Sequence, residues 1–224
     1  MLYTIRRSYK FLNPGIFVPL YKALVRTHLD YATSVWSPHK QKYVKQLESV
    51  QRRATKMLPG FSDLSYEERL RKLKLPTLAF RRIRCDMIET YKIVHGFYDQ
   101  EVSPSLSMHT STYTQDNCTS KTRGHPFKLY KTRFYKDIGK FAFSNRIFEQ
   151  WNSLSAHVVT AESVNQFKNR LDKYWGDQPL LYDFEAKFQK PRPPTTLHTI
   201  EEIQEVVRLP EGPAQEPPLE MSRQ

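Results

Sequence analysis

The sequence predicts a mainly α-helical protein that ends in an acidic, proline-rich tail. Apolar residues recur at spacings of three and four along several stretches, which is the periodicity of a helix with one buried face. Residues that start or stop helices bracket these stretches. The 224 residues carry a net charge of +12, and such a surplus favours a polyanionic partner.

The composition divides the chain into four regions. They are a helical region (1–98), a Ser/Thr-rich loop with a basic aromatic segment (99–136), a C-terminal helical pair (137–176) and a tail (177–224). The tail holds eight of the 15 prolines and nine Asp or Glu against five Lys or Arg, so we expect it to be disordered. Since the whole chain carries +12 and the tail −4, residues 1–176 carry +16.

The first long helix is expected between Asn13 and Trp36. Asn13 and Pro14 have the residue types of an N-cap and a first helical position. Pro19 lies too deep for a regular helix, so the helix either kinks or begins near Pro19. The predicted buried face contains Phe17, Leu20, Leu24, His28, Ala32 and Val35. We therefore predict His28 to be a core histidine rather than a ligand or catalyst.

The next helix is predicted to start at Ser37 and Pro38 and to stop at Pro59 and Gly60. Its apolar stripe consists of Tyr43, Leu47, Val50, Ala54 and Met57. The cations that lie mostly off this stripe are Lys42, Lys45, Arg52, Arg53 and Lys56. They indicate either an ordinary solvated face or a face for a polyanion.

Two further helices follow in the first region. Ser65 and Glu68 fit a capping box, and Pro76 ends the helix that they start. The second helix carries the stripe Phe80, Ile83, Met87, Tyr91 and Val94, with Gly96 as its C′ residue. Its first turns hold Arg81, Arg82 and Arg84, which the positive end of the helix dipole disfavours. A bound polyanion would offset this cost, and so would pairing with Glu67 or Glu68.

A basic aromatic segment runs from Lys121 to Lys140. Its cations are Lys121, Arg123, Lys128, Lys131, Arg133, Lys136 and Lys140, against the single acid Asp137. Its interleaved rings are Phe127, Tyr130, Phe134 and Tyr135. Cations can neutralise phosphates while rings stack on bases. The alternative is a β-hairpin with buried rings and solvated lysines.

A helical pair is predicted after this segment. Its first helix has Phe143, Ile147 and Trp151 on one face. Thr160 is expected to cap the second helix, and Gly176 to end it; its face carries Val164, Phe167, Leu171 and Tyr174. We expect Trp151 and Trp175 to be core anchors rather than stacking platforms. In the tail, Thr199 and Glu202 fit a capping box, so residues 199–208 could dock on a protein partner as a short helix.

Several classes of protein do not fit the sequence. Cys85 and Cys118 form no disulfide framework, and the histidines and cysteines lack zinc-ligand spacing, so we expect no metal and no cofactor. No apolar run approaches the ~18 residues that span a bilayer, and no signal-peptide core follows Arg6 and Arg7. We expect an intracellular protein, in the nucleus, the cytoplasm or both, with no membrane and no small-molecule substrate.

Several runs of sequence resemble the reverse transcriptases of LINE-type, jockey-like non-LTR retrotransposons. They cover nearly all of 1–176 in order and include LYKALVRTHLDYATSVWSP (20–38), LESVQRRATKML (47–58), YEERLRKLKLPTL (66–78), YKIVHG (91–96), TRGH (122–125), FSNRIFEQWNSL (143–154) and FKNRLDKYW (167–175). Ser155 departs from the family, which usually has Pro after the WN-L motif. The set is specific, although each motif alone is weak.

The resemblance implies the thumb and the C-terminal region of an RNA-directed DNA polymerase, with residues 1–98 thumb-like. Such a region grips an RNA or DNA duplex through its phosphates, without reading base sequence. The palm, with its Tyr-Ala-Asp-Asp motif, has no counterpart; Asp30 has no second aspartate beside it. We therefore expect no catalytic residue. The predicted nucleic-acid contacts are Lys45, Arg52, Arg53, Lys56, Arg81, Arg82, Arg123, Lys128, Lys131 and Arg133.

Two alternatives remain open at the level of sequence. The chain could be a domesticated helical module whose basic faces serve protein partners. It could also be a remnant reading frame without selected function.

Overall fold

The computed structural model describes residues 1–9, 11–99, 101, 103–104, 106–108 and 125–189. Over these ranges it is mainly helical, as predicted, and holds no strand beyond one isolated bridge between Met108 and Leu129. The elements are α1 (Leu2–Ser8), α2 (Pro14–Tyr21), η1 (Lys22–Arg26), α3 (Thr27–Asp30), α4 (Thr33–Trp36), α5 (Gln41–Lys56), α6 (Tyr66–Leu73), α7 (Leu78–Val94), α8 (Asp137–Phe141), α9 (Phe143–Arg146), α10 (Phe148–Asn152), α11 (Ala156–Val159), α12 (Val164–Tyr174) and η2 (Pro179–Leu181).

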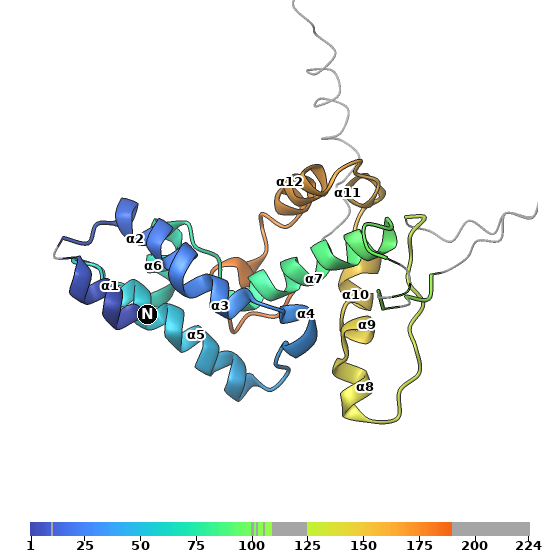
Figure 1. The fold of residues 1–224 in the computed structure, drawn as a ribbon, viewed down its shortest axis with the longest axis horizontal. Helices are drawn as coiled ribbons and strands as arrows, with labels where there is room; N and C mark the ends of the chain where they lie inside the picture. The colour runs from blue at the N-terminus through green and yellow to red at the C-terminus, as the bar shows by residue number, and fades with distance from the viewer. Residues whose placement is uncertain (10, 100, 102, 105, 109–124, 190–224) are drawn as a thin grey trace, which may run out of the picture. The chain divides into compact units, whose positions relative to one another are not determined.

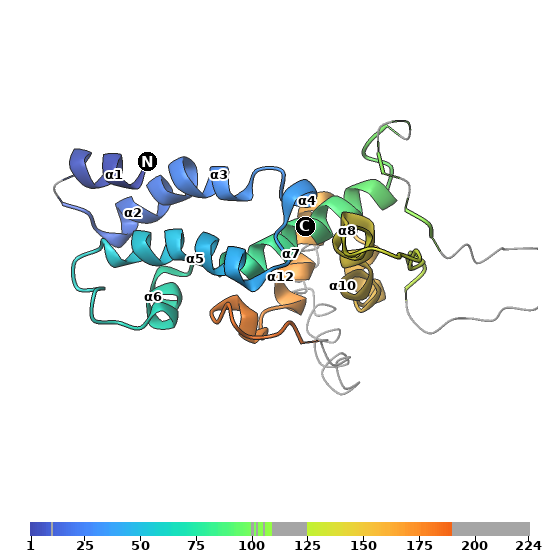
Figure 2. The same ribbon diagram turned by 90° about the horizontal axis from the view of Figure 1, so that it is seen from below.

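The described residues form two apolar clusters, and α7 contributes buried side chains to the second of them. Figures 1 and 2 show α7 between the group formed by α1, α2, α5 and α6 and the group formed by α8–α12. The first cluster is centred on buried side chains such as Phe17, Tyr21 and Leu70. The second contains Met87 and Tyr91 of α7 with Trp151, Phe167 and Trp175. Trp151 and Trp175 are 0% and 1% exposed, so the prediction that both are core anchors is confirmed.

Three predicted helix ends are confirmed. The Asn13 side chain accepts a hydrogen bond from the Ile16 N–H, 2.9 Å away. Ser65 and Glu68 form the predicted capping box. Gly96 has a φ of +70°, and the Phe97 N–H donates to the Lys92 carbonyl, which is the Schellman ending of α7.

The predicted helix starts at Ser37 and Thr160 are wrong, because each of these residues ends the preceding helix instead. The Ser37 N–H donates to the Thr33 carbonyl and terminates α4, so α5 begins only at Gln41. The Thr160 hydroxyl donates to the Ala156 carbonyl at the end of α11. Ser163 caps α12, its oxygen accepting from the Gln166 N–H.

The predicted buried face of the first long helix is correct only at its start. Phe17 is buried and Leu20 half-buried, whereas Leu24, His28, Ala32 and Val35 are exposed. Pro19 lies inside α2 and donates no hydrogen bond, and the wider π turn η1 follows immediately. The buried residues consequently recur every four positions, at Phe17, Tyr21 and Val25. This register turns His28 outward, so His28 is exposed rather than part of the core.

The regions after α7 differ from their prediction in two ways. Residues 125–136 form no hairpin, since Leu129 makes only the isolated bridge. The predicted helix through Phe143 and Trp151 is present as α9 and α10, which meet at Ile147, and Ile147 and Trp151 are buried as expected. Ala142, extended at ψ 154°, separates this helix from α8. The folded part continues past residue 176 to residue 189, and Leu180 is only 4% exposed. The predicted helix at 199–208 lies outside the described residues.

Candidate nucleic-acid interface

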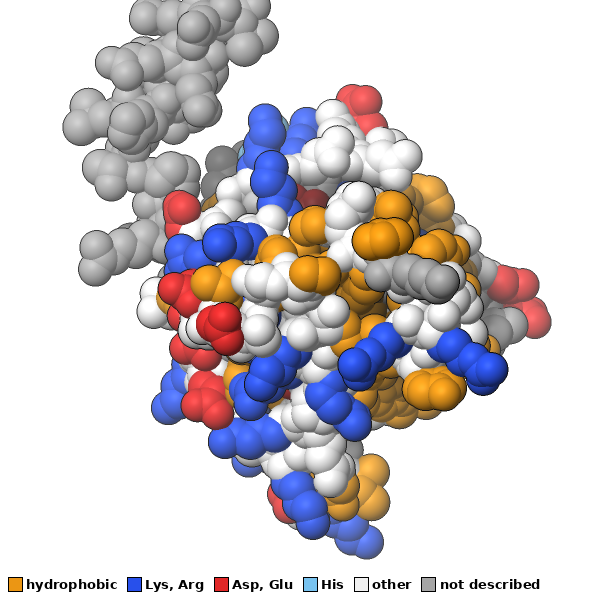
Figure 3. Space-filling view, turned by 90° about the vertical axis from the view of Figure 1, so that its left-hand side faces the viewer, with side chains coloured by type: hydrophobic (Ala, Val, Ile, Leu, Met, Phe, Trp, Pro, Cys, Tyr) orange, Lys and Arg blue, Asp and Glu red, His pale blue; other side chains and the backbone are white. Residues whose placement is uncertain are grey.

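Helix α5 has one cationic side and one buried side. Lys42, Lys45, Arg52, Arg53 and Lys56 are all exposed. At 100° per residue these five side chains fall within a sector of about 100° of the helix circumference. Figure 3 views the end of the molecule where α1, α2 and α6 lie, and Lys and Arg side chains are spread over much of that face. The predicted segregation of cations on α5 is therefore present in the structure.

The buried side of α5 is more polar than predicted. Ala54 is buried as expected, but Glu48, Gln51 and Thr55 are each 0% exposed, whereas Tyr43 is 49% exposed. At 100° per residue the true buried face is rotated by about 80° from the predicted apolar stripe. The spacing of Glu48, Gln51 and Thr55, three and then four, is itself helical. This polar stripe was the signal in the sequence that could have indicated the true buried face, and the periodicity of apolar residues alone did not reveal it.

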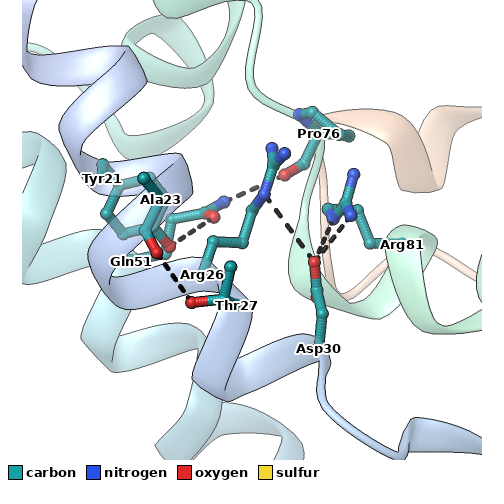
Figure 4. Close-up of polar contacts among 8 residues, drawn as sticks. All are labelled: Tyr21, Ala23, Arg26, Thr27, Asp30, Gln51, Pro76 and Arg81. Atoms are coloured by element: carbon teal, nitrogen blue, oxygen red, sulfur yellow. Dashed lines mark hydrogen bonds and ion pairs between the residues drawn. The ribbon is translucent and has the colours of Figure 1, made fainter.

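A hydrogen-bond network explains why these polar residues are buried. Glu48 accepts from the Tyr66 hydroxyl at 2.6 Å and from the Leu78 N–H at 3.1 Å. Gln51 accepts from the Tyr21 hydroxyl at 2.8 Å and donates to the Pro76 carbonyl at 3.0 Å (Figure 4). The network ties α5 to α2, α6 and the start of α7, so the orientation of the cationic side is fixed. Burial raises the pKa of the Glu48 carboxyl, and the bond from Tyr66 opposes this rise.

The arginines of α7 are structural rather than free. Arg81 donates two hydrogen bonds to Asp30, at 2.9 and 2.6 Å, and Arg26 lies 3.7 Å from the same carboxylate (Figure 4). Arg84 forms a two-bond pair with Asp172. The suggested partners were therefore wrong: Glu67 pairs with Arg71, and Glu68 completes its capping box.

The prediction that Arg82 contacts phosphate is not supported. Arg82 is only 4% exposed, and burial lowers the pKa of its guanidinium, although the charge of Glu48 opposes this lowering. A side chain inside the core cannot reach a phosphate without unfolding its surroundings. Arg81 is similarly committed to Asp30, so the α7 arginines are removed from the candidate interface.

The basic aromatic segment is anchored separately from α5. Asn152 bonds both backbone groups of Leu129, at 2.9 and 3.0 Å, and the Trp151 indole donates to the Phe127 carbonyl. Lys131 lies 5.9 Å from the ring of Phe134 and also 5.9 Å from that of Phe148.

The structure does not bring all the predicted contacts together. Arg133 is exposed, and Lys128 is half-buried and helps to lower the pKa of His125, after burial as the main cause. Figures 1 and 2 both place residues 125–136 on the other side of α7 from α5. Arg123 lies outside the described residues. The candidate interface is thus the α5 side, formed by Lys42, Lys45, Arg52, Arg53 and Lys56.

An open, mainly apolar groove lies elsewhere, between the loop after α4, the end of α7 and α8–α9. Its charged lining includes Lys40 and Arg146 but also Glu89, Asp99 and Asp137. Because acids outnumber these two cations, the groove does not extend the interface. Among the described residues, no group of three or more His, Cys, Asp or Glu side chains could hold a metal ion. No helix in the same ranges has the length and apolar character needed to cross a membrane.

Comparisons with known proteins identified no relative of this chain. No family model matches the sequence, and neither curated proteins nor solved structures gave a match.

Proposed function

We propose that this chain is a retroelement-derived helical fragment that binds the sugar-phosphate backbone of an RNA or DNA duplex without reading base sequence. The main observation behind the proposal is the α5 side, where five exposed cations share one sector of the helix. The buried side of the same helix is held in the core by hydrogen bonds. Cations on a rigid element can contact several phosphates at once. The resemblance to the thumb region of LINE-type reverse transcriptases supports the same proposal.

A salt titration tests this proposal. We expect duplex affinity to fall steeply with salt, with log K against log[salt] sloping by about −0.9 for each phosphate contacted on B-DNA. Fluorescence anisotropy at several salt concentrations, with two duplexes of unrelated sequence, measures both the slope and the indifference to sequence. Absence of binding at low salt would refute the proposal.

The proposal includes no catalysis by this chain alone. Two-metal phosphoryl transfer needs carboxylates that converge on the ions. Three partly or fully buried carboxylates are instead engaged, Asp30 by Arg81, Asp86 by Arg146 and Glu48 by Tyr66. We expect no primer extension on an RNA template with Mg²⁺ or Mn²⁺, assayed by gel electrophoresis of labelled primer. Extension above the level of an inactivated control would contradict this expectation.

The second candidate is a helical module that binds an acidic protein surface through the same α5 side. By charge alone, the exposed cations fit an acidic protein surface as well as they fit a duplex. A protein that binds only such a partner would not bind unrelated duplexes with a common slope of log K against log[salt]. A chain that ignores duplexes at low salt would favour this candidate.

A further inference from the structure

Residues 178–189 form a closed strap that follows α12. The Gln178 amide donates to the Gln189 carbonyl at 2.8 Å, and the Gln189 N–H donates to the Gln178 side-chain oxygen at 3.1 Å. These two bonds close the ends of the strap on each other. Thr77, the N-cap of α7, holds the strap near its start: its N–H donates to the Leu181 carbonyl and its hydroxyl to the Leu180 carbonyl. These hydrogen bonds make the strap an ordered part of the fold.

The middle of the strap reaches the cationic side of α5. The Glu185 carboxylate lies 3.0 Å from the Lys45 ammonium. The Arg52 guanidinium lies 5.3 Å from the ring of Phe184 and 5.2 Å from the ring of Tyr66. Two of the five interface cations are thus engaged by strap residues that are adjacent in sequence.

The contact between Glu185 and Lys45 resembles one that a polyanion would make. A carboxylate and a phosphate both offer anionic oxygens to a lysine ammonium. Lys45 and Arg52 are seven residues apart, so they are separated by about 10 Å along the helix axis. The Lys45–Glu185 pair is weak, because its side chains are 58% and 59% exposed, and exposed pairs are readily exchanged for another anion.

We propose that the strap is an internal competitor for the nucleic-acid site: Glu185 and Phe184 hold Lys45 and Arg52 in the free protein and leave them when a duplex backbone binds. This inference rests on the proposed function of the α5 side. It adds regulation to that site, because any event that loosens the strap raises affinity. The anchor at Thr77 keeps the strap attached while its middle moves.

Replacing Glu185 with Gln tests the competition. We expect E185Q to bind a duplex about three- to tenfold more tightly than the parent chain at low salt, since one competing exposed ion pair and one repelling charge are removed. The matched control is E162Q, which makes the same change in net charge at an exposed position before α12. We expect E162Q to change affinity less than twofold, and circular dichroism to show both variants folded.

A double-mutant cycle with K45Q identifies the route of the effect. If Glu185 acts through Lys45, the gain from E185Q shrinks in the K45Q background, and this outcome supports the proposal. Equal gains from E185Q and E162Q would reduce the effect to net charge and overturn it. Duplex binding by the parent with no gain in E185Q would overturn the strap alone and leave the proposed function intact. Failure of every variant to bind would overturn both.

Discussion

Replacing Arg52, Arg53 and Lys56 together with Gln is expected to lower duplex affinity by about two to three orders of magnitude near 0.1 M salt, if each cation contacts one phosphate. Each lost contact removes the release of about 0.9 counterion, so the slope of log K against log[salt] should flatten by nearly three. All three side chains are exposed, and Arg52 also contacts the rings of Tyr66 and Phe184. The free energy of unfolding of the variant in urea should therefore fall by no more than about 1 kcal/mol, the contribution of an exposed cation–π contact.

The control for this prediction removes the same charge elsewhere. Lys72, Lys74 and Lys173 are also exposed, and their replacement with Gln lowers the net charge equally. We expect this control to lose affinity much less, because diffuse charge steers association without contacting phosphate. Equal losses in the two triple variants, measured by anisotropy, would mean that α5 is not a defined interface.

The sequence predicted local structure well where the signal was local. The capping box of Ser65 and Glu68 and the Gly96 ending need only residues within one turn, and both are correct. The cations of α5 were placed on an outer side correctly because Lys and Arg are rarely fully buried. These features depend only on residues that lie close together in the sequence.

The prediction failed where distant contacts decide. The buried position of Glu48 depends on Tyr66 and on the N–H of Leu78, thirty residues away, which no helical periodicity reveals. Arg81 was separated from its partner Asp30 by 51 positions. The phosphate-binding role predicted for Arg82 likewise ignored burial by other elements. The strap was not predicted, because the acidic, proline-rich composition of residues 177–224 does not reveal that Leu180 is buried in the core.

Replacing Arg146 with Met is expected to lower the free energy of unfolding by about 3–5 kcal/mol, the cost of leaving a buried charge unpaired. Arg146 donates two hydrogen bonds to Asp86, at 2.9 and 2.8 Å, and two more to the Thr33 and Ser34 carbonyls. It thus joins α9 to α7 and α4. The Asp86 side chain is 7% exposed, so water cannot replace the lost partner. Urea unfolding at neutral pH measures the loss.

The pH dependence of this loss distinguishes a stranded charge from lost packing. Burial raises the pKa of Asp86, and the bonds from Arg146 hold this rise back, so the pKa rises further in the variant. A carboxyl whose folded pKa exceeds its unfolded value favours the folded state at low pH and loses that benefit as pH rises. The deficit of R146M should therefore be smallest in acid and grow with pH through the raised pKa. Adding D86N should recover much of the neutral-pH loss, because the amide carries no charge; a deficit unchanged by pH and by D86N would assign the role of Arg146 to packing.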